Sequence, residues 1–160
     1  MAYKTFMSSR PAGGLPFPFS TLNYPEDYKP SLSSRLAGGG KSAHMDVLVK
    51  RYIDQIYNLE IDNCLATSDS IIYLFPRHPL GYMFKSVTYW QWLFLYKNKN
   101  RELLNKFYIW NKKTIKISKE YQKLDKVRGM FFLGGAYGYR GRAKISEGKN
   151  LSAFFDARRG

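Results

Sequence analysis

The segment Gly38-Gly39-Gly40-Lys41-Ser42 contains residue types that bind phosphate at the start of a helix. In such loops the backbone N–H groups of a helix N-terminus surround the phosphates, and a lysine and a hydroxyl complete the site. The full pattern needs another glycine where Arg35 stands, and Pro30 and several serines precede it in place of a buried strand. A flexible hinge followed by a serine helix cap at Ser42 explains these residues better than nucleotide binding.

A second candidate is the run Arg128-Gly129-Met130-Phe131-Phe132-Leu133-Gly134, in which aromatic residues stand between glycines. Aromatic side chains on a strand can stack on RNA bases. Two positions of that strand pattern differ here, and the surrounding chain lacks the repeated strands that such a fold needs. We expect these aromatic side chains to act as apolar anchors instead.

Nucleophiles and metal ligands are few in this chain. The single cysteine, Cys64, excludes an intrachain disulfide and a multi-cysteine zinc site, and no neighbouring cation would lower its pKa. Of the two histidines, His44 and His78, the second lies in a turn with no ligand at metal-binding spacing. Asp54 and Glu60 belong to a group of acids that matches no catalytic spacing, so we expect no catalytic residue, no metal and no cofactor. The other members of that group are Asp62 and Asp69.

Five lysines in the second half of the chain predict one basic helical face. They recur at steps of four, three, four and three residues, while Phe107, Trp110 and Ile117 fall on the other side. A solvated face opposite a buried one is the common explanation of this pattern. Five lysines without compensating glutamates repel one another, however, and this favours a face that binds an anionic partner. The five are Lys112, Lys116, Lys119, Lys123 and Lys126.

The run from Tyr89 to Tyr96 is apolar all around a helix except at Gln91. A single groove cannot cover every side of such a helix, and a chain of 160 residues has little left to cover the rest. We therefore expect a protein partner, a second copy or a membrane interface over this belt. Its anchors are Trp90, Trp92 and Phe94. No segment has the roughly 20 consecutive apolar residues of a membrane span.

The elements that position these residues are helices. Neither Ser42–Phe75 nor Tyr82–Arg128 contains a glycine or a proline, and apolar residues recur in both at steps of three and four. The segment 76–82 reads as a turn, because two prolines and a glycine oppose helix continuation. We expect a mostly α fold in which residues 42–128 form a long antiparallel helical hairpin. Residues 67–70 could cap a second helix, so one helix or two between residues 42 and 75 stays open.

Both ends of the chain are expected to be extended, irregular arms. Residues 1–41 carry five of the seven prolines, and residues 129–160 interleave glycines with aromatic and basic residues. We predict that aromatic anchors and basic side chains of the arms contact partner subunits. The aromatic anchors are Phe17, Phe19, Tyr24, Tyr28, Phe131, Phe132, Tyr137 and Tyr139. The basic residues are Arg140, Arg142, Arg158 and Arg159.

The net charge of +14 limits the partners of this chain. We expect a non-catalytic accessory subunit of a large assembly, peripheral to the mitochondrial inner membrane and belonging to a respiratory-chain or ATP synthase complex, with anionic lipid head groups as further partners. An RNA-binding structural protein of a ribosome, mitochondrial or not, is the first alternative. A protein bound to the acidic lattice of a microtubule is the second. Lys4, Arg10 and the absence of acids before Glu26 are typical of a targeting segment, but prolines interrupt any helix there.

Overall fold

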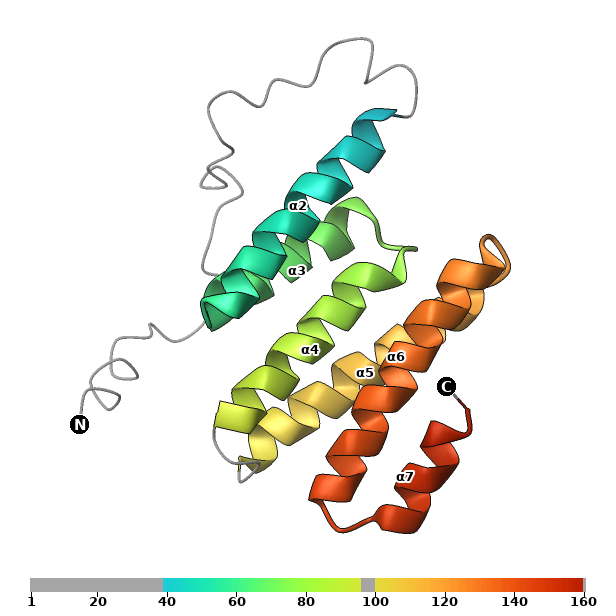
Figure 1. Cartoon of the computed structure of the whole chain (residues 1–160). Helices are drawn as coiled ribbons and strands as arrows, with labels where there is room; N and C mark the ends of the chain where they lie inside the picture. Colours follow the sequence, from blue (N-terminus) through green and yellow to red (C-terminus); the bar gives the residue numbers. More distant parts are fainter. Residues whose placement is uncertain (1–38, 96–99, 160) are drawn as a thin grey trace, which may run out of the picture. The chain divides into compact units, whose positions relative to one another are not determined.

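The structure is a computed structural model and describes residues 39–95 and 100–159. Over these residues the chain forms six helices and no strand, so the predicted mostly α fold is confirmed (Figure 1). The predicted N-terminal anchors Phe17, Phe19, Tyr24 and Tyr28 lie outside the described residues. The helices are α2 (Gly39–Tyr57), α3 (Ile61–Leu74), α4 (Pro79–Leu95), α5 (Arg101–Tyr121), α6 (Lys126–Ser146) and α7 (Asn150–Ala157).

Local signals in the sequence account for several helix starts. The side chain of Asn100 accepts a hydrogen bond from the backbone N–H of Leu103 at 3.0 Å, which caps α5. Asp125 caps α6 in the same way through the N–H of Arg128, at 2.9 Å. Pro79 is the first residue of α4. No intrahelical hydrogen bond needs an N–H at this position, and the fixed φ of proline suits a helix. The turn before α4 therefore covers residues 75–78 and is shorter than the predicted segment 76–82, whose last four residues belong to α4.

The stretch 42–75 forms two helices, and the chain turns between them at residues 58–60. Leu59 there has φ of 58°, a left-handed conformation that costs a branched side chain free energy. The predicted alternative cap at residues 67–70 lies inside α3 instead. There the hydroxyl of Ser68 donates to the carbonyl of Cys64 at 2.7 Å and that of Ser70 donates to the carbonyl of Ala66 at 3.0 Å. These hydroxyls bond back onto their own helix and do not start a new one.

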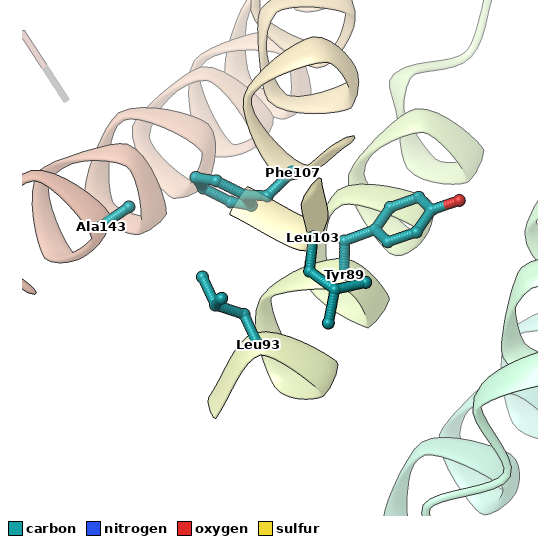
Figure 2. Packing of buried hydrophobic residues seen from close by; sticks show 5 residues of the cluster. All are labelled: Tyr89, Leu93, Leu103, Phe107 and Ala143. Atoms are coloured by element: carbon teal, nitrogen blue, oxygen red, sulfur yellow. The ribbon is translucent and has the colours of Figure 1, made fainter. Parts of the chain in front are cut away.

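Consecutive helices from α3 to α7 pack against one another, and α4 also contacts α6. Short connections join these helices. The stretch 82–128, predicted as one long arm of a hairpin, is divided among α4, α5 and the start of α6. Figure 2 shows the central cluster, in which α4, α5 and α6 each contribute apolar side chains. Its buried members are Tyr89, Leu93, Leu103, Phe107 and Ala143.

Helix α2 is anchored on α4 mainly through Tyr52. The rings of Tyr52 and Phe84 stack with centroids 3.8 Å apart and planes 6° from parallel. The Tyr52 hydroxyl donates to the carbonyl of Phe84 at 2.9 Å and lies 3.0 Å from the hydroxyl of Thr88. Burial raises the pKa of the Tyr52 phenol, so the side chain stays neutral in this position.

The C-terminal region differs from the irregular arm that its glycines predict, because residues 126–146 and 150–157 are helical. Each glycine lowers helix propensity by about 1 kcal/mol relative to alanine. In α6, however, two of the glycines lie where atoms of neighbouring residues are close to the position that a side chain would take. A Cβ added at Gly135 would lie 2.8 Å from the Cε of Met83 on α4, and one at Gly129 would lie 2.7 Å from the Cα of Gln122. Packing against neighbours therefore outweighs propensity here.

Candidate interaction surfaces

The five predicted lysines are all exposed, but they do not share one helix. Lys112, Lys116 and Lys119 lie on the outer side of α5, opposite the buried Phe107 and Thr114. Helix α5 ends at Tyr121, so Lys123 lies in the turn and Lys126 is the first residue of α6. The basic face is thus a strip along α5 that continues around the α5–α6 turn.

The aromatic belt of α4 is covered by its own chain to a larger extent than expected. Tyr89 and Leu93 are buried, and Trp90 and Trp92 are half-buried and pack on the central cluster. The expectation that a partner must cover the whole belt is therefore wrong for Tyr89 and Leu93, whereas the contact of Trp90 and Trp92 with a partner stays a prediction. α5 and α6 supply the cover, because both helices pack against α4. Phe94 remains exposed at the end of α4.

The predicted aromatic anchors of the C-terminal region divide between the interior and the surface. Phe132 and Tyr137 are buried and belong to the chain's own core, so the prediction that they contact a partner is wrong. Tyr139 is half-buried and packs on the central cluster. Phe131 is exposed on α6 and is the one C-terminal anchor of the four that can meet a partner directly.

Arg140 is engaged within the chain, which corrects its assignment to an anionic partner. Its Nε donates to Oδ2 of the fully buried Asp156 at 2.8 Å, and Nζ of Lys144 lies 2.7 Å from the same oxygen. Burial acts to raise the pKa of Asp156, but hydrogen bonds from Arg140 and Lys144 outweigh it and lower that pKa. This ion cluster fixes α7 on α6. The predicted basic residues Arg142, Arg158 and Arg159 are exposed.

A second cationic arrangement surrounds Trp110 on α5. Nζ of Lys85 lies 4.2 Å from the Trp110 ring centroid and Nζ of Lys113 lies 4.0 Å from it, so two cations flank one indole. Lys85 also forms an ion pair with Asp69 of α3. The nearly buried ammonium of Lys85 is therefore balanced by a carboxylate and an aromatic face. This arrangement serves helix packing.

Side chains that could do chemistry are few among the described residues. Cys64 is buried, and burial raises the pKa of its thiol to about 11, so it is protonated and unreactive. The ring of His78 packs edge-on against Tyr121 and Phe132, with centroids 4.8 and 5.4 Å away. Burial and the nearby Arg128 lower the pKa of His78. Residues 39–95 and 100–159 hold no group of three or more potential metal ligands.

The main surface feature that sequence reasoning missed is a set of exposed apolar residues at the two ends of α6. Leu124, Val127 and Met130 are exposed beside the α5–α6 turn, and Ile145 and Leu151 beside the α6–α7 turn. Their spacing alone could not separate them from core positions, because helical periodicity does not say which apolar face has a neighbour. None of the described helices is long and apolar enough to span a membrane.

Comparison with known proteins gives no counterpart for this chain: no protein-family model, no curated protein and no solved structure matches it.

Proposed function

We propose that this protein is a non-catalytic structural subunit of a larger multi-subunit assembly. One observation carries the proposal: the described residues expose sixteen large hydrophobic side chains, while ten polar or charged residues are buried alongside fourteen hydrophobic ones. Single exposed apolar side chains are normal, but groups of them on one face indicate an interaction site. We therefore infer that partner proteins cover groups of these exposed apolar side chains.

Helix α7 and the end of α6 form the clearest of these groups. Leu151, Phe154 and Phe155 are exposed on α7 at steps of three and one, and Ile145 is exposed near the end of α6. We call these four residues the C-terminal apolar face. The ion cluster at Asp156 holds α7 in place, so the face is presented by a fixed backbone, which lowers the entropy cost of docking. Large apolar side chains on a fixed helix are typical of protein interfaces.

The apolar character of these surfaces favours a protein assembly at a membrane over the RNA alternative. Cations recognise RNA phosphates and aromatic rings can stack on RNA bases, but such a partner would leave the aliphatic Ile145 and Leu151 of this face in water. The exposed lysines of α5 would serve either partner equally and do not separate the two. A mitochondrial inner-membrane location and the respiratory-chain or ATP synthase class remain predictions from the sequence.

The proposal is tested by following a tagged full-length chain in extracts of the cells that produce it. The wild type should migrate with a particle far larger than 18.6 kDa on native gels. The variant Phe154→Gln/Phe155→Gln should incorporate at least about tenfold less, since burying each ring is worth about 1.5–3 kcal/mol. The matched control Ser152→Gln/Ala157→Gln adds glutamines to exposed positions of the same helix and should incorporate normally.

Two results would overturn the proposal. In the first, the wild type migrates at its own mass in those extracts. In the second, a variant of an exposed polar residue incorporates normally but abolishes the turnover of the purified assembly, which would identify a catalytic role.

A further inference from the structure

We propose that the α5–α6 turn is a docking site for an anionic lipid surface. The turn and the residues beside it carry four exposed apolar side chains and four exposed cations, which together we call the turn patch. Its apolar members are Leu124, Val127, Met130 and Phe131. Its cations are Lys119, Lys123, Lys126 and Arg128. The partner is a membrane whose surface lipids carry phosphate or carboxylate charges.

The apolar members of the turn patch lie among the most exposed hydrophobic side chains of the described residues. Leu124, Val127 and Phe131 keep 75, 79 and 70% of their surface accessible. Leu124 lies in the connection between α5 and α6, and Val127 and Phe131 lie in the first two turns of α6. Most of the surface of each side chain is left uncovered by the described residues. Such side chains can enter the boundary between head groups and acyl chains, while neighbouring lysines extend their charged ends toward the phosphates.

Several N–H groups in and beside the turn are already hydrogen-bonded, which lowers the cost of its insertion into a lipid interface. The N–H groups of Leu124 and Asp125 both donate to the carbonyl of Tyr121, each at 2.9 Å. The N–H of Gly129 donates to the carbonyl of Asp125, also at 2.9 Å. A lipid interface supplies few partners for bare N–H groups, so each of these satisfied donors lowers the cost of approaching it.

The cations in the first turn of α6 destabilise the start of that helix. Lys126 and Arg128 lie in the first turn of α6, which has no acidic residue. The positive end of a helix macrodipole favours anions there and disfavours cations. The capping carboxylate of Asp125 offsets this in part, through the N–H of Arg128 and an ion pair at 3.5 Å with its Nε. An external anionic surface would compensate the remaining cations and the helix end together.

The adjacent α3–α4 turn adds a further cation at this end of the helices. His78 in that turn contacts Tyr121 and Phe132, with ring centroids 4.8 and 5.4 Å away, so the two turns lie side by side. Arg77, next to His78, is exposed. An acidic protein or an RNA could meet these cations. A lipid surface is favoured because it accepts cations and the interleaved Leu124 and Val127 at once.

This inference deepens the proposed function, because it places one surface of the proposed subunit on lipid, and it is tested on the purified full-length chain alone. Sedimentation with phosphatidylcholine vesicles, with and without phosphatidylserine, gives the affinity. We expect binding only with phosphatidylserine, and weaker binding as salt rises. The variant Lys119→Gln/Lys123→Gln/Lys126→Gln should bind about 100-fold more weakly at physiological salt, at about fivefold per lysine. The variant Leu124→Gln/Val127→Gln/Phe131→Gln should lose at least about tenfold.

A matched control removes three exposed cations elsewhere. The variant Lys50→Gln/Arg101→Gln/Lys149→Gln should bind within about threefold of wild type at physiological salt, where charges beyond roughly 8 Å are screened. Circular dichroism and urea unfolding should show that all three variants keep the wild-type fold, since every substituted side chain is exposed.

Three outcomes would overturn the inference: no binding to phosphatidylserine vesicles, equal losses in the control and turn variants, or tighter binding to polyuridylate RNA that depends on the lysines alone. If vesicle binding fails while the chain still incorporates into its assembly, only this inference is lost. If the turn binds vesicles but the chain migrates alone in cell extracts, the proposed function is lost instead.

Discussion

Replacing Asp156 by asparagine should release α7 from α6. The carboxylate is fully buried and receives Arg140 Nε at 2.8 Å and Lys144 Nζ at 2.7 Å. Asparagine has nearly the same shape, but it is neutral and turns an NH₂ group toward one of the two cations. The perturbation therefore removes charge compensation and leaves the packing around Ala153 nearly unchanged.

The magnitude follows from the burial of the two cations. Removing one partner of a buried ion pair costs about 3–5 kcal/mol, because the other charge stays uncompensated. The side chains of Arg140 and Lys144 keep 22 and 20% of their surface accessible, so water relieves part of this cost. We expect about 3 kcal/mol for Asp156→Asn. The more distant Arg159, at 3.9 Å from Asp156 and 63% exposed, provides the control. Arg159→Gln should cost under about 1 kcal/mol.

The assay combines urea unfolding with amide hydrogen exchange, because α7 packs mainly on α6 and can detach before the rest unfolds. Asp156→Asn should lose protection in α7 far more than in α5. The lowered pKa of Asp156 adds a pH test. Its contribution to stability is complete above the unfolded pKa of about 4 and is lost as pH falls through the lower folded value. The difference in free energy of unfolding between wild type and Asp156→Asn should therefore become smaller at acidic pH. A loss below about 1 kcal/mol, or equal loss of protection in α5 and α7, would refute this account.

Two further predictions test the packing of α6 and the environment of His78. Gly129→Ala should destabilise the chain by about 1–3 kcal/mol, because a Cβ there would lie 2.7 Å from backbone atoms of the preceding turn. Gly138→Ala, where a Cβ would meet nothing within 4 Å, should instead stabilise it by about 1 kcal/mol, and urea midpoints compare the two. Since the pKa of His78 is lowered in the folded state, stability should fall as pH drops below about 6.5, and His78→Gln should flatten that slope. Arg128→Gln should raise the pKa of His78, measured by NMR titration, and an unchanged value would contradict the role given to Arg128.

The helices over residues 45–57 and 101–121 were predictable, because apolar residues recur there at helical spacing without glycine or proline. The turn between α2 and α3 was not, since Leu59 adopts a left-handed conformation that sequence patterns assign to glycine or asparagine. The helical C-terminal region was not predictable either. A glycine lowers helix propensity wherever it stands. At Gly135 it also makes room for Met83, and sequence patterns do not reveal this contact because Met83 is 52 residues away in the chain.

For the surface residues, too, some features were predictable from the sequence and others depend on tertiary packing. The exposure of Lys112 and Lys116 follows from their charge and spacing alone. The burial of Phe132 and the exposure of Phe131 do not, because two adjacent phenylalanines on a helix look alike until the neighbours are known. The internal pairing of Arg140 likewise depends on α7 folding back to bring Asp156 into reach, sixteen residues further along the chain. Sequence reasoning named the kinds of contact, and tertiary packing decided which residues make them.

The two proposed surfaces lie at opposite ends of α6, and this placement has a mechanical consequence. Helix α6 has 21 residues and so extends over roughly 30 Å, from the turn patch at Lys126 to the C-terminal apolar face beyond Ser146. α4 and α5 pack along it, and the Asp156 cluster ties α7 to it, so the two surfaces are joined by packed helices (Figure 1). A subunit built in this way can hold a protein partner at a set distance from a lipid surface. Loosening α7 through Asp156→Asn should then weaken incorporation into the assembly while leaving vesicle binding by the turn patch intact. Equal loss of both would show that the two surfaces do not act separately.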